Sequence, residues 1–155
     1  SGVTATVKSL VVYGGQVDHA VAGDSITIVL NEDVDASRGD VLVHESAPAT
    51  VSRQFQADLC WLDTQPLNPA RKYLLKHGTR LTSAKIKGVL SRRDIHELGE
   101  IPGNEAPFAM NDIGRVELAT RDALALDRYD DIPATGAFIL IDEATNQTAA
   151  AGMVR

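Results

Sequence analysis

The chain has 155 residues, of which 44% are hydrophobic, a length that can bury one sizeable core or two small ones. Its formal net charge of −6 argues against a dedicated nucleic-acid binder, because such proteins are usually basic. Its single cysteine, Cys60, excludes an internal disulfide, and no apolar run or signal peptide points to a membrane, so we expect a cytoplasmic protein with no membrane partner.

The first part of the chain reads as strands separated by glycine turns. Thr4–Tyr13 is rich in β-branched residues and stops at Gly14–Gly15, and Ser25–Leu30 alternates polar and apolar residues. The second strand lies between Ala22–Asp24 and Arg38–Asp40, each of which places a Gly before an Asp. The glycine permits a tight bend and the aspartate can cap the freed backbone amides. This arrangement resembles the second domain of translation-factor-like GTPases, so Arg38–Asp40 is interpreted as a barrel turn.

Further short strands follow the break at Ala47–Ala49, where we place a domain boundary between residues 48 and 49. Ser91–Gly99 is the one segment with a helical pattern, and Ile101–Pro107 is expected to be irregular. Many short strands with regular turns are typical of antiparallel barrels, so the sequence predicts an all-β fold with Trp61, Phe138, Leu140 and Val154 buried. The predicted strands are 54–62, 72–76, 79–86, 88–90, 112–118 and 137–142.

Basic residues are concentrated in one stretch. Eight of the fifteen lysines and arginines lie between Arg71 and Arg93, a window that contains no acid. One interpretation is a pair of strands with solvated outer faces and cationic edges that discourage sheet association. The other is a docking face for an acidic partner, to which Arg71, Lys72, Arg80 and Lys85 would contribute. The sequence leaves both interpretations open.

No catalytic constellation is recognisable in the chain. The phosphate-binding pattern G-x-x-x-x-G-K-[ST] is absent, and the four histidines are scattered without a second metal ligand at suitable spacing. Asp127 and the pair Asp130–Asp131 are interpreted as a solvated loop, because consecutive residues of an extended segment point in different directions. We therefore expect no catalytic, cofactor-binding or metal-binding residue, and an isolated chain without enzymatic activity.

The last part of the chain identifies a family. Ala137–Ile141 is a short apolar run, Glu143–Gln147 is a polar loop in which Asn146 suits a chain reversal, and Ala149–Gly152 has almost no side-chain bulk. With Asn111–Leu118 before it, this ending resembles the large subunit of bacterial sulfate adenylyltransferase, the CysN/NodQ family. The resemblance implies barrels like those of elongation factor Tu: the closing part of a domain-2 barrel over residues 1–48 and a complete domain-3 barrel over residues 49–155.

The resemblance also implies what surrounds the chain. In this family a GTPase domain precedes the barrels and holds GTP and magnesium, while a separate small catalytic subunit joins sulfate to ATP to give adenosine 5′-phosphosulfate. We therefore expect a fragment of a longer protein, a non-catalytic barrel region whose partners are that GTPase domain and the small subunit in sulfate assimilation. Two alternatives stay open: the tRNA-binding barrels of a translation-factor GTPase, and a stand-alone protein-interaction module.

Overall fold

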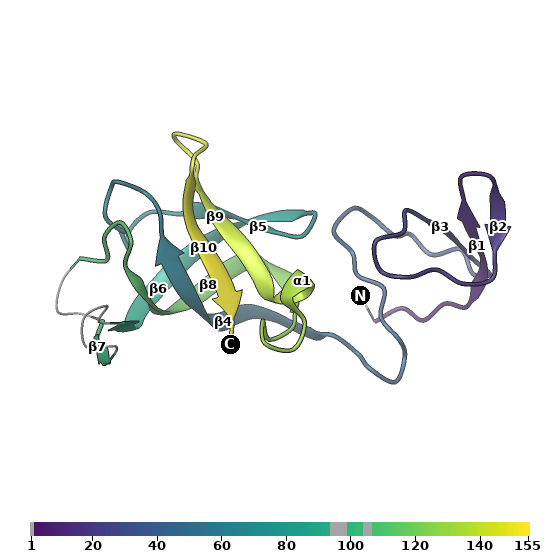
Figure 1. Cartoon of the computed structure of the whole chain (residues 1–155), viewed down its shortest axis with the longest axis horizontal. Helices are drawn as coiled ribbons and strands as arrows, with labels where there is room; N and C mark the ends of the chain where they lie inside the picture. Colours follow the sequence, from purple (N-terminus) through teal and green to yellow (C-terminus); the bar gives the residue numbers. More distant parts are fainter. Residues whose placement is uncertain (1, 94–98, 104–106) are drawn as a thin grey trace. The chain divides into compact units, whose positions relative to one another are not determined.

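The computed structural model describes residues 2–93, 99–103 and 107–155, which divide into two compact units, Ser1–Ser37 and Arg38–Arg155 (Figure 1). Strands make up nearly all the regular structure of both units. The helix among the described residues, α1 (Pro133–Gly136), is a single turn that begins at a proline and leads directly into a strand. The expected all-β class is confirmed.

The first unit is a small antiparallel sheet. Its strands are β1 (Val7–Val12), β2 (Gly15–Val17) and β3 (Thr27–Leu30), in the order β2–β1–β3. Gly14 and Gly15 form the reversal between β1 and β2. Their φ values are 108° and 141°, a backbone conformation that residues with a side chain rarely adopt. Between residues 2 and 37 no residue is fully buried, so this sheet has no core of its own.

The second unit is a closed antiparallel barrel of six strands. They follow the order β5–β9–β10–β4–β8–β6, and a further pairing of β5 with β6 closes the ring (Figure 1). A short additional strand, β7 (Glu100–Pro102), pairs with the end of β6. The barrel strands are β4 (Thr50–Trp61), β5 (Tyr73–His77), β6 (Arg80–Arg93), β8 (Ile113–Leu126), β9 (Ala137–Asp142) and β10 (Thr148–Val154).

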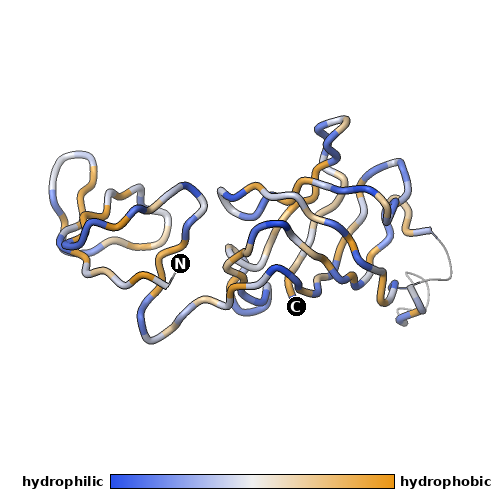
Figure 2. The backbone as a smooth tube through the Cα atoms, turned by 180° about the vertical axis from the view of Figure 1, so that it is seen from behind, coloured by the Kyte–Doolittle hydropathy of each residue, from blue (hydrophilic) through white to orange (hydrophobic). Residues whose placement is uncertain are grey.

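The barrel interior is filled by alternate residues of its strands. Figure 2 shows hydrophobic segments recurring along the barrel tube, as expected for strands with one face turned to a core. The four residues predicted to be buried are confirmed, since Trp61, Phe138, Leu140 and Val154 are 1%, 5%, 0% and 5% exposed. The Trp61 indole lies edge-on to the rings of Tyr73 and Phe108, and its Nε1–H donates to the Gln65 carbonyl at 2.8 Å.

The structure differs from expectation around the end of β6. Ser91–Arg93, predicted to begin a helical turn, belong to β6, while residues 94–98 of that prediction lie outside the described residues. Pairing of this segment with β7, and of Ser91 and Arg92 with β8, replaces the local helical preference with long-range hydrogen bonds. Ile101 and Pro102, expected to be irregular, lie in β7, and the end of that stretch includes residues 104–106, which are also outside the described residues.

The second unit begins with a segment that contains no strand over its fully described length from Arg38 to Ala49, and β4 begins at Thr50. Arg38–Asp40 forms a turn with Gly39 at φ 99°, and the apolar run Val41–Val43 that follows is exposed.

Candidate functional site

The basic stretch forms the hairpin of β5 and β6. The pairing of Tyr73 with Ala84 and of His77 with Arg80 fixes which side chains face the barrel interior. Tyr73, Leu75 and His77 point inward and are buried, so the alternate positions of the hairpin face outward. Basic residues that are consecutive in this stretch therefore cannot all lie on the same face of the hairpin.

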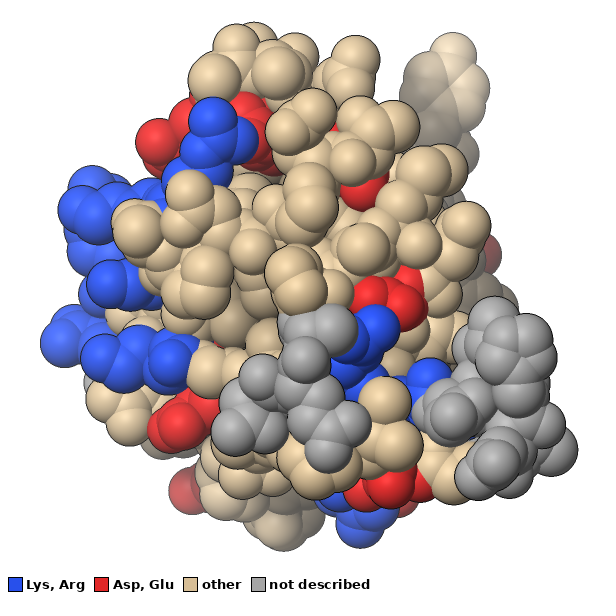
Figure 3. Space-filling view, turned by 90° about the vertical axis from the view of Figure 1, so that its left-hand side faces the viewer, with Lys and Arg blue, Asp and Glu red and all other residues tan. Residues whose placement is uncertain are grey.

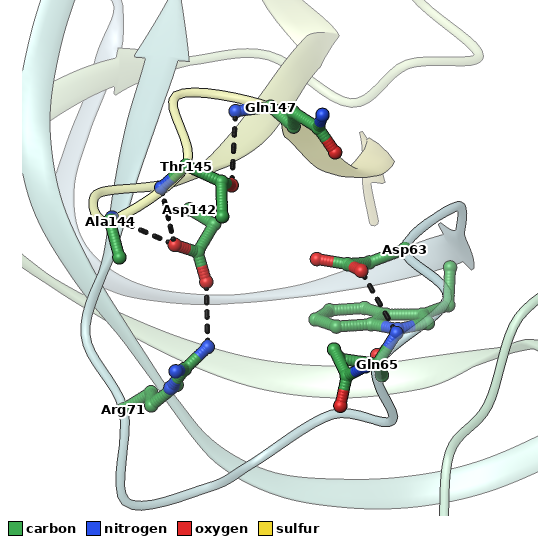
Figure 4. Close-up of polar contacts among 8 residues, drawn as sticks. Asp63, Gln65, Arg71, Asp142, Ala144, Thr145 and Gln147 are labelled. Atoms are coloured by element: carbon green, nitrogen blue, oxygen red, sulfur yellow. Dashed lines mark hydrogen bonds and ion pairs between the residues drawn. The ribbon is translucent and has the colours of Figure 1, made fainter.

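Arg71 lies just before β5 and is bound to a buried carboxylate. Its Nη1–H donates to Asp142 Oδ2 at 2.8 Å, while Asp142 Oδ1 accepts the N–H groups of Ala144 and Thr145 at 2.8 and 3.1 Å (Figure 4). The hydrogen bond from Ala144 lowers the pKa of Asp142 most, and the bond from Thr145 and the Arg71 charge add to it against the opposing effect of burial. Arg71 thus fastens the start of β5 to the turn after β9.

Arg80 is the first residue of β6, opposite the last residue of β5, and contacts the segment before β4. Its Nη1 is 3.6 Å from Asp40 Oδ1, and the backbone at Gly39 lies against its side chain, since a Cβ added there would be 3.1 Å from Arg80 Cβ. Because β5 contains five residues, roughly 17 Å of strand separates Arg71 from Arg80. The structure therefore does not bring these two arginines together.

Lys72 and Lys85, in contrast, lie next to each other on the outer wall. Lys72 directly precedes β5, and continuing the pairing of Tyr73 with Ala84 by one residue places it beside Lys85. Lys76 lies on the same face of the hairpin, and Lys87 is exposed two residues beyond Lys85, where the register of β6 with β8 shifts. We call Lys72, Lys76, Lys85 and Lys87 the lysine face. Among the described residues, none of its four side chains makes an ion pair within 4.0 Å.

Sequence reasoning did not single out Lys76 and Lys87, although the sequence carries a usable signal. Lys72 and Lys76 are four residues apart, which predicts one face of a strand for both, and Lys85 and Lys87 have the same even spacing, although the register of β6 shifts between Ile86 and Gly88. Arg71 and Lys72 are consecutive in the sequence, so their side chains point in different directions. Figure 3 shows Lys and Arg side chains gathered in a column along one border of the molecule, with carboxylates toward its ends.

The closed barrel removes one explanation for these charges. β5 lies between β9 and β6, and the first half of β6 lies between β5 and β8, so neither presents an open edge there. Cationic protection of an edge strand, one of the interpretations of the sequence, therefore does not apply to this hairpin. A solvated outer face and a docking face remain.

Other candidate groups have structural partners. His77 is buried with Nε2 2.7 Å from the Thr135 carbonyl, and Asp127 accepts the Thr135 hydroxyl at 2.5 Å. Within the described parts of the chain, no group of three His, Cys, Asp or Glu side chains is arranged to hold a metal ion. The same residues include no helix with the length and apolar character needed to cross a membrane.

Comparison with known proteins identifies a family and several relatives of the chain. The family model for GTP-eEF1A C-terminal domain-like proteins matches residues 54–155. Sulfate adenylyltransferase subunit 1 of Vibrio parahaemolyticus is 38% identical over 155 residues, which cover all of this chain and 32% of that protein. The bifunctional enzyme NodQ of Rhizobium sp. (strain N33) is 38% identical over 154 residues, covering 99% of this chain and 24% of that protein.

The chain therefore spans about a third or less of these relatives. The crystal structure of sup35 complexed with GDP is 19% identical with a TM-score of 0.83, covering 97% of this chain and 37% of that one, and shows the fold alone. The resemblance to the sulfate adenylyltransferase large subunit and the translation-factor-like barrel are both confirmed.

Proposed function

Because the chain belongs to the GTP-eEF1A C-terminal domain-like family, we propose that it is the non-catalytic barrel region of a sulfate adenylyltransferase large subunit. The observation that carries the proposal is the 38% identity to subunit 1 of Vibrio parahaemolyticus along the whole chain. In this role the barrel supports GTP-driven formation of adenosine 5′-phosphosulfate from ATP and sulfate through contacts with other domains and subunits.

The organisation of the chain supports a role inside a larger assembly. The barrel has its own core, which includes Leu59, Leu75, Leu118 and Leu140, each 0% exposed. The first unit has no fully buried residue between positions 2 and 37, so a stable sheet needs cover from another part of the parent protein. We propose residues 1–48 and 49–155 as the segments of two barrel domains, with GTP and magnesium held by a GTPase domain of the parent.

The charged side chains of the barrel wall support a scaffolding role for this region. Asp58, Asp112 and Asp142 are each engaged by an arginine from a distant part of the sequence or a neighbouring strand. Such pairs hold strands and turns in place, and neutralised carboxylates of this kind are not free to exchange protons with a substrate. The sequence also lacks the glycine-rich loop and lysine that would cradle a nucleotide phosphate.

A domain exchange in the full-length large subunit tests the proposal. Residues 49–155 are replaced by the corresponding barrel of a translation factor, and the protein is combined with the small subunit. We expect GTP binding by the parent to persist while GTP-stimulated formation of adenosine 5′-phosphosulfate is lost. Unchanged adenosine-phosphosulfate formation would refute a specific role for this barrel. Separately, the isolated chain should show no saturable binding of a fluorescent GTP analogue, and micromolar affinity would reveal a nucleotide site.

The fold shared with sup35 and the lysine face favour one second candidate, the tRNA-binding barrels of a translation-factor GTPase. Binding of this kind depends on phosphate contacts and falls steeply with salt concentration. Fluorescence anisotropy with labelled tRNA between low and physiological salt distinguishes the two. We expect no saturable binding at physiological salt, and a tight, salt-sensitive complex would favour the second candidate.

A further inference from the structure

The lysine face combines cations with exposed apolar side chains. On the outer side of the hairpin, Leu81 is paired with Lys76 and is 53% exposed, and Leu74 and Ser83 separate this pair from Lys72 and Lys85. Lysine charges beside an exposed leucine combine two components of a protein-binding surface, because the apolar side chain supplies burial and the charges orient the partner.

Several carboxylates elsewhere on the barrel wall are paired with arginines. Asp58 receives Arg115 and Arg155 at 3.1 and 2.7 Å, and Asp112 receives Arg92 at 2.8 Å. Two acidic side chains lie on β8, the strand beside the lysine face: Glu117, which is paired with Gly88 and partly buried, and Asp122, which accepts the Thr82 hydroxyl at 2.7 Å. Two partly buried carboxylates against four exposed lysines leave the face positive on a chain whose net charge is −6.

The lysine face also works against folding of the isolated chain. Lys72 and Lys85 occupy neighbouring positions across the hairpin, and like charges placed opposite each other destabilise a strand pair. The closed barrel gives these cations no edge to protect. A binding partner with opposite charge would remove this repulsion. Binding would therefore account for the neighbouring lysines, which the barrel alone does not need.

The chemistry of the face selects the class of partner. Its cations are lysines, whose strongly hydrated charges act over a distance, and it lacks the arginine forks and exposed aromatic rings that bind nucleic acid among its outward residues. Long-range attraction accelerates the encounter of separate molecules. A domain tethered to the same chain is already present at high effective concentration and gains little from it.

We propose that the lysine face of β5 and β6, with Leu81 at its turn end, docks a carboxylate-rich protein surface carried by a separate chain. The inference rests on the proposed function, under which that chain is the small catalytic subunit. Arg71 and Arg80 are not part of the docking surface, because their guanidinium groups are engaged by Asp142 and Asp40 within the barrel unit. The contact steers association and sets orientation, and the leucine adds burial.

The test reverses Lys76 and Lys85 to glutamate in the full-length large subunit and measures association with the small subunit by stopped flow at low and high salt. We expect the association rate at low salt to fall about 10-fold or more, and the difference from the parent to shrink at high salt. The matched control is K8E/R53E, which makes the same charge change at two exposed positions, on β1 and β4. Its association rate should fall much less.

Two further measurements keep the outcomes separate. Urea unfolding of the isolated barrel variant should show no loss of stability, since K85E places a carboxylate across the hairpin from Lys72 and K76E faces the uncharged Leu81. If the parent subunit assembles and supports adenosine-phosphosulfate formation but K76E/K85E associates at the parental rate, the docking surface is refuted and the proposed function stands. If the parent itself does not associate with the small subunit, the proposed function fails. Selective loss of tRNA binding in K76E/K85E would also overturn the protein-docking inference.

Discussion

Arg71 and Asp142 lie 71 positions apart, yet a 2.8 Å hydrogen bond between their side chains joins the segment before β5 to the turn after β9 (Figure 4). The Asp142 side chain is 6% exposed, and its second oxygen holds two backbone N–H groups of that turn. One carboxylate therefore organises the turn and anchors β5. Replacing it affects two elements at once.

The first prediction concerns the pH dependence of this anchor. The pKa of Asp142 is lowered in the folded chain, so its contribution to stability is complete above the ordinary aspartate value of 3.8 and is lost as the pH falls below it. The D142N variant should be less stable at neutral pH and lose less stability on acidification than the parent. Urea unfolding at a series of pH values measures both, with the exposed Glu143→Gln as control for loss of one charge.

A second prediction concerns the close packing of β10 on β9. Gly152 is paired with Phe138, and a Cβ added at Gly152 would be 2.2 Å from Phe138 Cζ. The substitution Gly152→Ala should therefore destabilise the barrel by about 1–3 kcal/mol through overpacking. Gly88→Ala is the matched control, because an added Cβ at Gly88 meets no atom within 4 Å. Equal urea midpoints for the two variants would contradict the packing argument.

The third prediction concerns the aromatic centre of the core. Trp61 is 1% exposed and packs edge-on against Tyr73 and Phe108, so Trp61→Ala should cost about 3–5 kcal/mol of unfolding free energy. Its neighbour Leu62 is 43% exposed, and Leu62→Ala should change stability by no more than about 0.5 kcal/mol. Circular dichroism follows both transitions, because the substitution removes the single tryptophan. A stable W61A barrel would show that the core tolerates the cavity.

The fourth prediction concerns the charge cluster on β4. Asp58 accepts hydrogen bonds from Arg115 Nε at 3.1 Å and Arg155 Nε at 2.8 Å, with 13% of its side chain exposed. Asp58→Ala leaves two guanidinium groups side by side, and we expect a loss of about 1–3 kcal/mol, the scale of hydrogen bonds to charged groups. Asp130, which is 58% exposed and also contacts Arg155, is the control, and D130A should lose clearly less stability.

Local patterns in the sequence account for much of the fold. The apolar run from Ala137 predicts a buried strand, and β9 spans Ala137–Asp142. Asn146 was expected to suit a reversal, and it adopts φ 58° in the turn between β9 and β10. These predictions succeed because each depends on the properties of a few consecutive residues. The one-turn helix α1 carries no such periodic pattern and could not be anticipated.

The candidate interface was less accessible from sequence. The basic window is visible, but which of its cations share a surface depends on the barrel register and on partners far away in the chain. Asp142 draws Arg71 to one end of the hairpin and Asp40 draws Arg80 to the other, while Lys72 and Lys85 meet on the wall. Ion pairs that span distant segments follow from closure of the barrel, which local composition does not encode.

The double pairing of β10 has a consequence for biosynthesis. Val154 and its neighbours on β10 fill the place between β4, which begins at Thr50, and β9. During translation the facing edges of β4 and β9 therefore stay without their hydrogen-bond partner until β10 itself has left the ribosome. Joining residues about a hundred positions apart is slow compared with hairpin formation. In that interval the nascent chain has two strand edges with unpaired backbone hydrogen-bonding groups, which can pair with other chains. Chaperone binding at this stage should protect it from aggregation.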